Sequence, residues 1–238
     1  MNKQPIKIKI QAMLVHFLIS LAIFAVIAYL LRYYFYPEFH FSMNGGMQGF
    51  TLMFYVDVVL GPLLTFMVYN RPPAKSRGKL YFDFICIAIV QFSALFYGAH
   101  TVYKERPVLA ILYNDGNATI VNARELASDF AHIDPEKIAG YKRVGGIPLA
   151  FYRFDANLNQ RIYQNVAEVD TATMEKVEEN INRFLEPEKK EMIQTAVQRA
   201  GRPVWYFAMI GKYTGAYVIV DRNFNFIELV GEQEIAPL

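Results

Sequence analysis

The sequence predicts an integral membrane protein in which three transmembrane helices precede an extracytoplasmic α+β domain with a mostly antiparallel sheet. Three apolar stretches, at about 12–31, 49–70 and 84–103, are each near the ~20 residues that cross a ~30 Å hydrocarbon core. The composition then changes to that of an ordinary soluble domain. Within the soluble part, strand-like and helix-like patterns alternate with turn signals. These observations divide the chain into a membrane region, 1–107, and a second domain, 108–238.

The charge distribution supports the same division. Residues 1–103 contain eight Lys and Arg against three Asp and Glu, whereas residues 104–238 contain sixteen against nineteen. The first part is therefore apolar with basic flanks, and the second part is slightly acidic. Neither part has the concentrated basic face of a nucleic-acid-binding protein, so we expect no nucleic-acid partner.

The first apolar stretch is predicted to stay as a membrane anchor. It is longer than the apolar region of a signal peptide, and Arg32 and aromatic residues follow it where a cleavage site would need small residues. Orientation follows from the short loops, because Lys and Arg favour the cytoplasmic side. The N-terminal tail and the loop between the second and third stretches are basic, which predicts a cytoplasmic N-terminus and an extracytoplasmic second domain. The basic residues are Lys3, Lys7, Lys9, Arg71, Lys75, Arg77 and Lys79.

The second domain begins with a predicted β-hairpin over 108–121, with Asp115-Gly116 in its turn. Asn122 and Glu125 match a capping box for a helix over 123–130. Apolar spacings of three and four predict a helix from Asp170 to about Leu185 and a second helix from Pro187 to before Gly201. The remaining predicted strands are 148–154, 204–210, 215–220 and 226–230.

Two features of this domain bear on function. Trp205-Tyr206-Phe207 is either an exposed binding patch or part of a strand in the core, and alternation within a strand favours the core. The single cysteine, Cys86, lies in the third apolar stretch, so no intramolecular disulfide stabilises the domain.

Asp57 is the strongest candidate for a functional side chain. It lies within the second apolar stretch, where a carboxylate costs several kcal/mol unless it is paired or protonated. Gly61 and Pro62 follow one turn later, and the proline removes a backbone hydrogen bond at nearly the same depth. Two interpretations stay open: a structural contact that holds the helices together, or a contact with a partner.

Depth along the helices predicts which polar groups meet Asp57. At ~1.5 Å per residue, Asp57 lies ~12 Å from the outer face, Tyr97 ~9 Å, Ser93 ~15 Å and Gln91 ~18 Å. Ser93, Tyr97 and His100 share one helical face. This face is predicted to meet Asp57, with Tyr97 or Ser93 closest. His16, at ~23 Å, is predicted to lie near the inner boundary and too far away for direct contact with Asp57.

The sequence contains no recognisable catalytic or metal-binding constellation. Ser42 is not in a nucleophile elbow, and Asp57 is the only carboxylate within a predicted span. His40 and His132 lack a second histidine at metal-ligand spacing. We therefore expect no enzymatic activity, no metal and no cofactor.

Several motifs resemble the type IV pilin accessory proteins, also called fimbrial assembly accessory proteins, which are bacterial inner-membrane proteins. The similarity covers roughly residues 10–125 and becomes weaker in the second domain. The most specific motif is the Asp-x-Val-Leu-Gly-Pro-Leu-Leu-Thr signature. The matching segments are Gly46-Met-Gln-Gly49, Val56-Asp-Val-Val-Leu-Gly-Pro-Leu-Leu-Thr65, Gln91 with Thr101-Val-Tyr103, and Arg106-Pro-Val108.

The resemblance implies a multi-pass protein of the bacterial inner membrane that binds a cognate type IV pilin. It would support pilin assembly or pilus dynamics in a chaperone-like way, in contact with the lipid bilayer and other pilus assembly components. Pilins of this kind carry an apolar N-terminal helix with an acidic residue and a free α-amino group near its start, and Asp57 is predicted to contact that helix. The hypothetical partner-binding residues are Asp57, Gly61, Pro62, Gln91, Ser93, Tyr97 and His100.

Two functions from other classes are weighed against this one. A membrane-anchored receptor or sensor without enzymatic activity would share the layout, but the short predicted cytoplasmic segments leave no room for a signalling domain. The third function is a small transporter or an intramembrane enzyme. Three spans that contain a single carboxylate are too few for transport unless the protein oligomerises.

Overall fold

The computed structural model describes residues 6–69 and 76–234. The chain forms two compact units, and the second unit takes one segment from between the first two long helices. The first unit contains Met1–Phe35 and Gly46–Tyr103, and the second contains Tyr36–Gly45 and Lys104–Leu238. Lys3, Arg71 and Lys75, on which the predicted orientation partly depends, lie outside the described residues.

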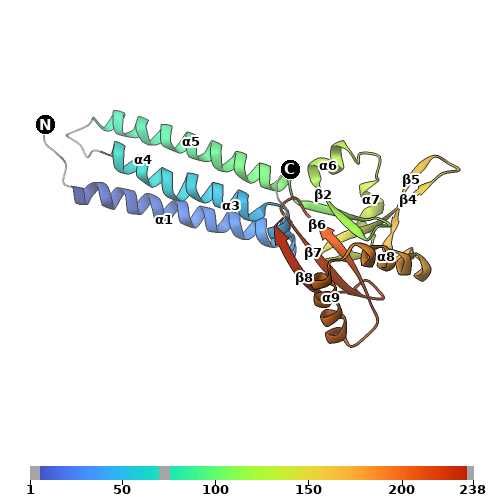
Figure 1. Ribbon diagram of the computed structural model, residues 1–238. Coiled ribbons are helices and arrows are strands. Elements are labelled where there is room, and N and C mark those ends of the chain that lie inside the picture. Colours follow the sequence, from blue (N-terminus) through green and yellow to red (C-terminus); the bar gives the residue numbers. More distant parts are fainter. Residues whose placement is uncertain (1–5, 70–75, 235–238) are drawn as a thin grey trace. The chain divides into compact units, whose positions relative to one another are not determined.

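The first unit consists of three helices that are long and apolar enough to cross a membrane, at Ile6–Phe35, Gly46–Val68 and Arg77–Lys104. They run side by side in Figure 1. Two of them contain π-helical turns, which widen the helix locally by one residue. In order, the unit contains α1 (Ile6–Leu30), η1 (Leu31–Phe35, π), α3 (Gly46–Phe54), η2 (Tyr55–Leu60, π), α4 (Gly61–Val68) and α5 (Arg77–Lys104).

Glycines allow the second and third long helices to approach each other closely. A Cβ atom at Gly61 would overlap the Gln91 side chain, and one at Gly49 would overlap Val102. On α5, a Cβ at Gly98 would lie 2.7 Å from Met53 Cγ. These contacts fix which face of α5 points inward.

The second unit is built on one eight-stranded mixed sheet in the order β3-β4-β1-β2-β6-β7-β8, with β5 paired to β4. Two pairings are parallel, β1 with β4 and β2 with β6, so the mostly antiparallel sheet predicted from the sequence is corrected to a mixed one. The strands are β1 (Pro107–Leu112), β2 (Asn117–Asn122), β3 (Arg143–Val144), β4 (Ile147–Asp155), β5 (Gln160–Asn165), β6 (Val204–Ile210), β7 (Thr214–Asp221) and β8 (Phe226–Glu234).

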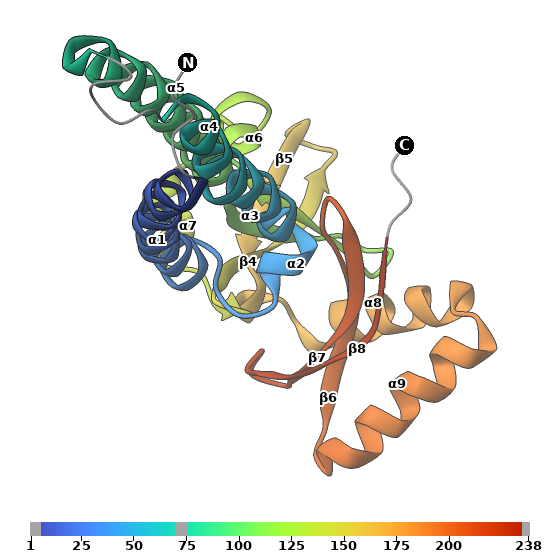
Figure 2. The same ribbon diagram turned by 90° about the vertical axis from the view of Figure 1, so that its left-hand side faces the viewer.

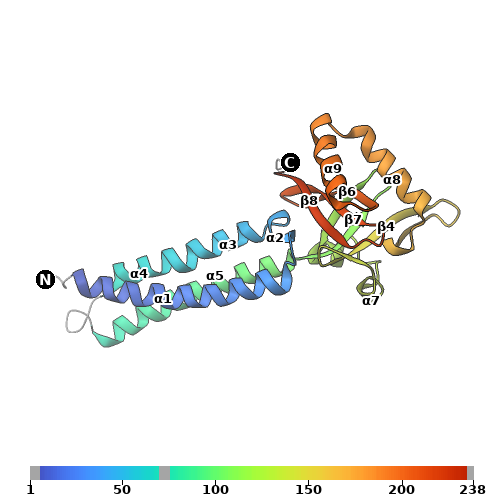
Figure 3. The same cartoon turned by 90° about the horizontal axis from the view of Figure 1, so that it is seen from below.

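Helices cover the sheet on more than one side. In Figure 3, α8 and α9 lie side by side and α7 lies on the other side of the sheet. Figure 2 shows α9 beside the strands β6, β7 and β8. The helices of this unit are α2 (His40–Met43), α6 (Ala123–Ser128), α7 (Pro135–Ala139), the 3-10 turn η3 (Val166–Glu168), α8 (Thr171–Phe184) and α9 (Pro187–Ala200).

Alternating residues of the strands supply separate apolar clusters. Along β1, Leu109 and Ile111 pack towards α6 and α7, whereas Ala110 and Leu112 pack into the main core with Met174 of α8. This two-residue alternation is what a strand buried on both faces requires. The Trp205 and Phe207 side chains are buried in the main core, which confirms the core interpretation of that strand.

Local signals for helix ends behave as predicted. Asn122 and Glu125 form both hydrogen bonds of a capping box, and the Asp170 carboxylate accepts a hydrogen bond from Thr173 N–H at the start of α8. Gly201 ends α9 in the left-handed conformation with φ of 62°. Elements without a clear sequence signal, β3, β5 and α7, were not predicted.

The segment between the first two long helices is a structural part of the α/β unit. Tyr36, His40 and Met43 are fully buried, and Met43 joins the main core. The Tyr213 N–H donates to the Met43 carbonyl oxygen at 2.9 Å. Gly45, at φ of 83°, packs against the Tyr213 ring, where a side chain would overlap it. The predicted division at residue 107 assigned residues 36–45 to the membrane region, whereas the structure places them in the α/β unit.

Candidate functional site: a polar cavity in the three-helix unit

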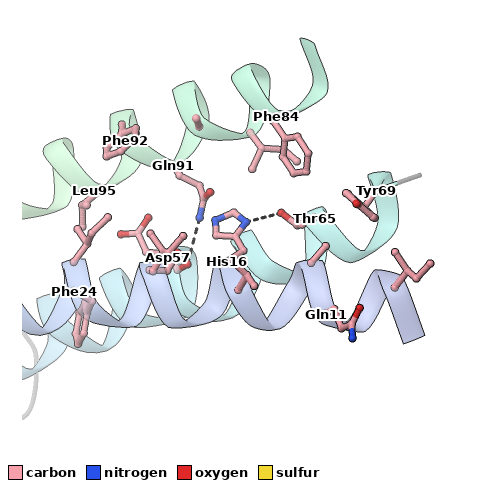
Figure 4. A pocket seen from close by; sticks show the side chains of 18 residues that line it. Gln11, His16, Phe24, Asp57, Thr65, Tyr69, Phe84, Gln91, Phe92 and Leu95 are labelled. Atoms are coloured by element: carbon pink, nitrogen blue, oxygen red, sulfur yellow. Dashed lines mark hydrogen bonds between the residues drawn. The ribbon is translucent and has the colours of Figure 1, made fainter. Parts of the chain in front are cut away.

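A cavity of about 650 Å³ lies among the three long helices of the first unit (Figure 4). Its size falls within the range of small-molecule sites, which are usually apolar with a few polar groups. Most of its walls are aliphatic or aromatic. The lining residues are Ile8, Gln11, Ala12, Val15, His16, Ile19, Ser20, Ile23, Phe24, Asp57, Thr65, Tyr69, Phe84, Ile87, Ala88, Gln91, Phe92 and Leu95.

Four polar side chains meet at the wall of this cavity. His16 Nδ1 and Thr65 Oγ1 are hydrogen-bonded to each other, and Gln91 Nε2 donates to the backbone oxygen of Asp57 at 3.3 Å. Figure 4 shows Asp57, Gln91 and His16 gathered between the helices, with Thr65 beside the histidine. A polar cluster of this kind within an apolar bundle is a candidate functional site.

The contact between Gln91 and Asp57 follows from the local backbone. In a π-helical turn each carbonyl oxygen is paired with the N–H five residues later. The residue five positions after Asp57 is Pro62, which has no N–H. The Asp57 oxygen thus has no donor at the π-helical position, and the Gln91 side chain supplies one. Gly61 makes this approach possible because it has no side chain to block Gln91.

The Asp57 carboxyl group itself is the least satisfied group at the site. Its residue is 5 % exposed, and Oδ2 has no hydrogen-bond partner among the described residues. No ion pair joins Asp57 to a cation within residues 6–69 and 76–234, and the cavity lining contains no lysine or arginine. Burying a polar oxygen without a donor costs about 1–3 kcal/mol. This cost can be recovered if a partner provides a donor.

The prediction that Ser93 or Tyr97 lies closest to Asp57 is wrong. Ser93, Tyr97 and His100 are exposed, with Tyr97 at 73 %, and none of them lines the cavity. The inward face of α5 is instead the one with Gln91 and Leu95. Depth along a helix gives the height of a residue but not its direction around the axis, and the close-packed glycines set that direction.

His16 was predicted to be an interfacial residue remote from Asp57, but it lines the same cavity. Its neighbour Thr65 was missed as well. A signal for Thr65 is present in the sequence, because Asp57, Gly61 and Thr65 follow one another at spacings of four on successive helical turns. The segment between the first two spans, predicted as an outer loop, is part of the second unit and contains the short helix α2.

The described part of the chain contains no group of three His, Cys, Asp or Glu side chains that could hold a metal ion. Cys86 is a free, exposed cysteine on α5. The expectation that the protein is not an enzyme stays a prediction. The groups that the cavity offers to a ligand are a carboxylate oxygen, an amide and a hydroxyl–imidazole pair, set in apolar walls.

Comparison with known proteins finds three relatives, each named a fimbrial assembly protein. The chain is 26% identical to the fimbrial assembly protein of serogroup I and 25% identical to that of serogroup E1, both from Dichelobacter nodosus, over 97% of each chain. It is 36% identical to the fimbrial assembly protein of serogroups C1 and C2 of the same organism over 115 residues, which are 48% of this chain and 86% of the relative. No family model and no solved structure matches the chain.

Proposed function

Because this chain belongs to the type IV fimbrial assembly protein family, we propose that it is an accessory factor of type IV fimbrial biogenesis that binds a pilin subunit in the bacterial inner membrane. It supports the assembly of that subunit or the dynamics of the pilus, in a chaperone-like way and without catalysis. The N-terminus is cytoplasmic and the α/β domain is periplasmic, as the basic flanks of the helices favour.

The observation that carries this proposal is the cavity among the three apolar helices. Helices in a membrane associate through close packing and interhelical hydrogen bonds, because lipid tails are as apolar as their side chains. A cavity with apolar walls and the unpartnered Asp57 Oδ2 provides both for an incoming apolar helix. The N-terminal helix of a pilin is such a helix.

The α/β unit is the second contact region of this proposal. It is a folded domain with its own core, large enough to bind the globular head of a pilin. A pilin held at both its helix and its head would be kept from aggregating before it is assembled. Other pilus assembly components are further partners in this proposal.

The alternative function is a membrane-anchored sensor of a periplasmic ligand. It would use the same α/β unit but would not need a cavity between the helices. We favour the pilin-binding function because Asp57 Oδ2, the buried side-chain atom without a hydrogen-bond partner in the described part of the three-helix unit, is at that cavity.

Site-specific photo-crosslinking in cells tests the proposal. A photo-reactive phenylalanine analogue at Phe84, which lines the cavity, is compared with the same analogue at Phe82, which is 66 % exposed and does not line it. We expect a crosslink to the pilin from position 84 and little from position 82. Absence of a pilin crosslink at position 84, with the protein present at its normal level and pili still formed, would overturn the proposal.

A further inference from the structure

The cavity of the three-helix unit contains one carboxylate and no lysine or arginine to balance it. Among its lining residues, Asp57 is the only carboxylate and there is no lysine or arginine. His16 is hydrogen-bonded to Thr65 and forms no described ion pair with Asp57. The described bundle therefore provides an acceptor at this point without a lysine, an arginine or an ion-paired histidine beside it.

We infer that the cavity recognises a protonated amine carried by an apolar helix, with the Asp57 carboxylate as its acceptor. The inference rests on the proposed function, since the helix is that of the bound pilin. A buried carboxylate is strongly destabilised when it is alone and much less so when it is paired with a cation and hydrogen-bonded. An ammonium group has three donors and satisfies Oδ2 directly.

The walls of the cavity define the rest of the ligand. Aliphatic and aromatic side chains from α1 and α5, such as Ile19, Ile23 and Leu95, surround the polar cluster. They would pack against the body of the ligand, while the amine meets Asp57. Gln91 lies beside the carboxylate, and its Nε2 donates to the backbone oxygen of Asp57.

The depth of Asp57 selects a helix as the source of the amine. The second long helix spans 23 residues, Gly46–Val68, and Asp57 is near its middle. At ~1.5 Å per residue it is about 16 Å from the Gly46 end, which is half of a ~30 Å hydrocarbon core. The amine of a phospholipid is attached to a charged phosphate that stays at the membrane surface, so it does not reach that depth, whereas an alkylamine without a phosphate can move inward as the neutral base. An amine on a membrane-embedded helix can reach the same depth.

Photolabelling of the full-length protein in phosphatidylcholine nanodiscs tests the inference without a pilin. The probe is a dodecylamine with a diazirine in its chain, and the comparison probe is the matching dodecanol. Adducts on α1 and α5 are mapped by mass spectrometry. We expect at least about tenfold more labelling of cavity residues by the amine than by the alcohol, since a hydrogen bond to a charged group contributes that much.

Variants distinguish recognition by Asp57 from simple partition into the bundle. In Asp57→Asn we expect the amine preference to fall to about one, with labelling by the alcohol unchanged. Asp83→Asn is the matched control, because Asp83 is a carboxylate on α5 that does not line the cavity. It should keep the preference. Equal size-exclusion profiles for all variants show that the bundle is folded.

The outcomes separate the inference from the proposed function. Equal labelling by the two probes, or an amine preference that survives in Asp57→Asn, would overturn the inference and identify Asp57 as a neutral structural group. If pilin crosslinking at Phe84 persists in that case, the proposed function still holds. An amine preference that depends on Asp57 supports the inference, even if the crosslink to the pilin fails.

Discussion

Among the described residues, each unit buries one ionisable side chain that has an unpartnered polar atom, Asp57 in the three-helix unit and His40 in the α/β unit. The two differ in the space around them. His40 is fully buried, its ring centroid is 4.4 Å from that of Phe39, and a Cβ atom on Gly145 would lie 2.9 Å from Nε2. Asp57 lines a cavity of about 650 Å³.

This difference separates a structural group from a binding group. Burial lowers the pKa of His40 to about 3, so the ring is neutral and packs as an aromatic side chain. The backbone of Val144 and Gly145 lies near the ring without hydrogen-bond geometry. It raises the pKa of His40, but by less than burial lowers it. An unpartnered polar atom thus indicates a binding site where space for a partner adjoins it, as at Asp57.

The largest expected effect tests the tight packing around His40. We expect Met43→Ala to lower the free energy of unfolding of the α/β unit by about 2–5 kcal/mol, because a fully buried methionine leaves a cavity. Fluorescence of Trp205, the only tryptophan, reports this unfolding in a urea titration. The control is Met67→Ala, whose side chain is 71 % exposed. Equal unfolding of the two variants would contradict the packing.

The next effect is a pH dependence that comes from His40. The folded state resists protonation of this ring, whereas the unfolded state binds a proton near pH 6.5. Its contribution to stability is therefore complete above pH 6.5 and is lost as the pH falls towards 3. From pH 6.5 to 4.5 we expect a loss of about 2–3 kcal/mol that is absent in His40→Leu. The exposed His132, changed to leucine, should leave the dependence intact.

Enlarging an alanine in each unit compares the space directly. Ala150 is fully buried in the sheet, and we expect Ala150→Leu to cost about 1–3 kcal/mol through overpacking. Ala12 lines the cavity of the bundle, so Ala12→Leu should fit and leave the thermal stability of the full chain nearly unchanged. Size exclusion after heating measures the second effect. A destabilised Ala12→Leu variant would show that the cavity is not available to a partner.

The smallest effect concerns Glu178, a half-buried carboxylate of the α/β unit. Burial raises the pKa of Glu178 to about 7, while Arg222 lowers it in part. Between pH 4.5 and 7 the unfolded state loses its proton more readily than the folded state, so stability falls over this range and the loss is complete above pH 7. We expect Glu178→Gln to stabilise the unit modestly at pH 8 and not at pH 4.5, by Trp205 fluorescence. The exposed Glu191, changed to glutamine, should show no such difference.

Local patterns predicted much of the α/β unit. The hairpin of β1 and β2, the capping box at Asn122, the helices α8 and α9 and the strands β6 to β8 all have turn residues, caps or apolar periodicity that act over a few residues. The strand β5 was missed because its residues Gln160–Asn165 are mostly polar and half-exposed. The two parallel pairings join distant segments, and no local pattern specifies them.

The candidate site was predicted in its centre and missed at its edge. Asp57, Gly61 and Gln91 of the predicted set lie at or beside the polar cluster, whereas Ser93, Tyr97 and His100 do not, and the role of the set in binding a partner stays a prediction. The face of α5 that points into the bundle depends on which glycines allow close contact between the helices. These contacts place Gln91 on the inward face and leave Ser93 exposed. The participation of His16 depends on the pairing of α1 with α4, which one sequence does not specify.

The placement of Tyr36–Gly45 makes the α/β domain discontinuous in sequence, because the chain passes between the two units three times. Cutting the chain after Tyr103 would therefore not yield two intact parts. The truncated bundle would keep Met43 and His40 without their cover, and the isolated C-terminal fragment would lack a segment of its core. A soluble version of the domain needs residues 36–45 joined to it through a linker. By the same reasoning, inheritance or exchange of this domain as a single contiguous block is disfavoured.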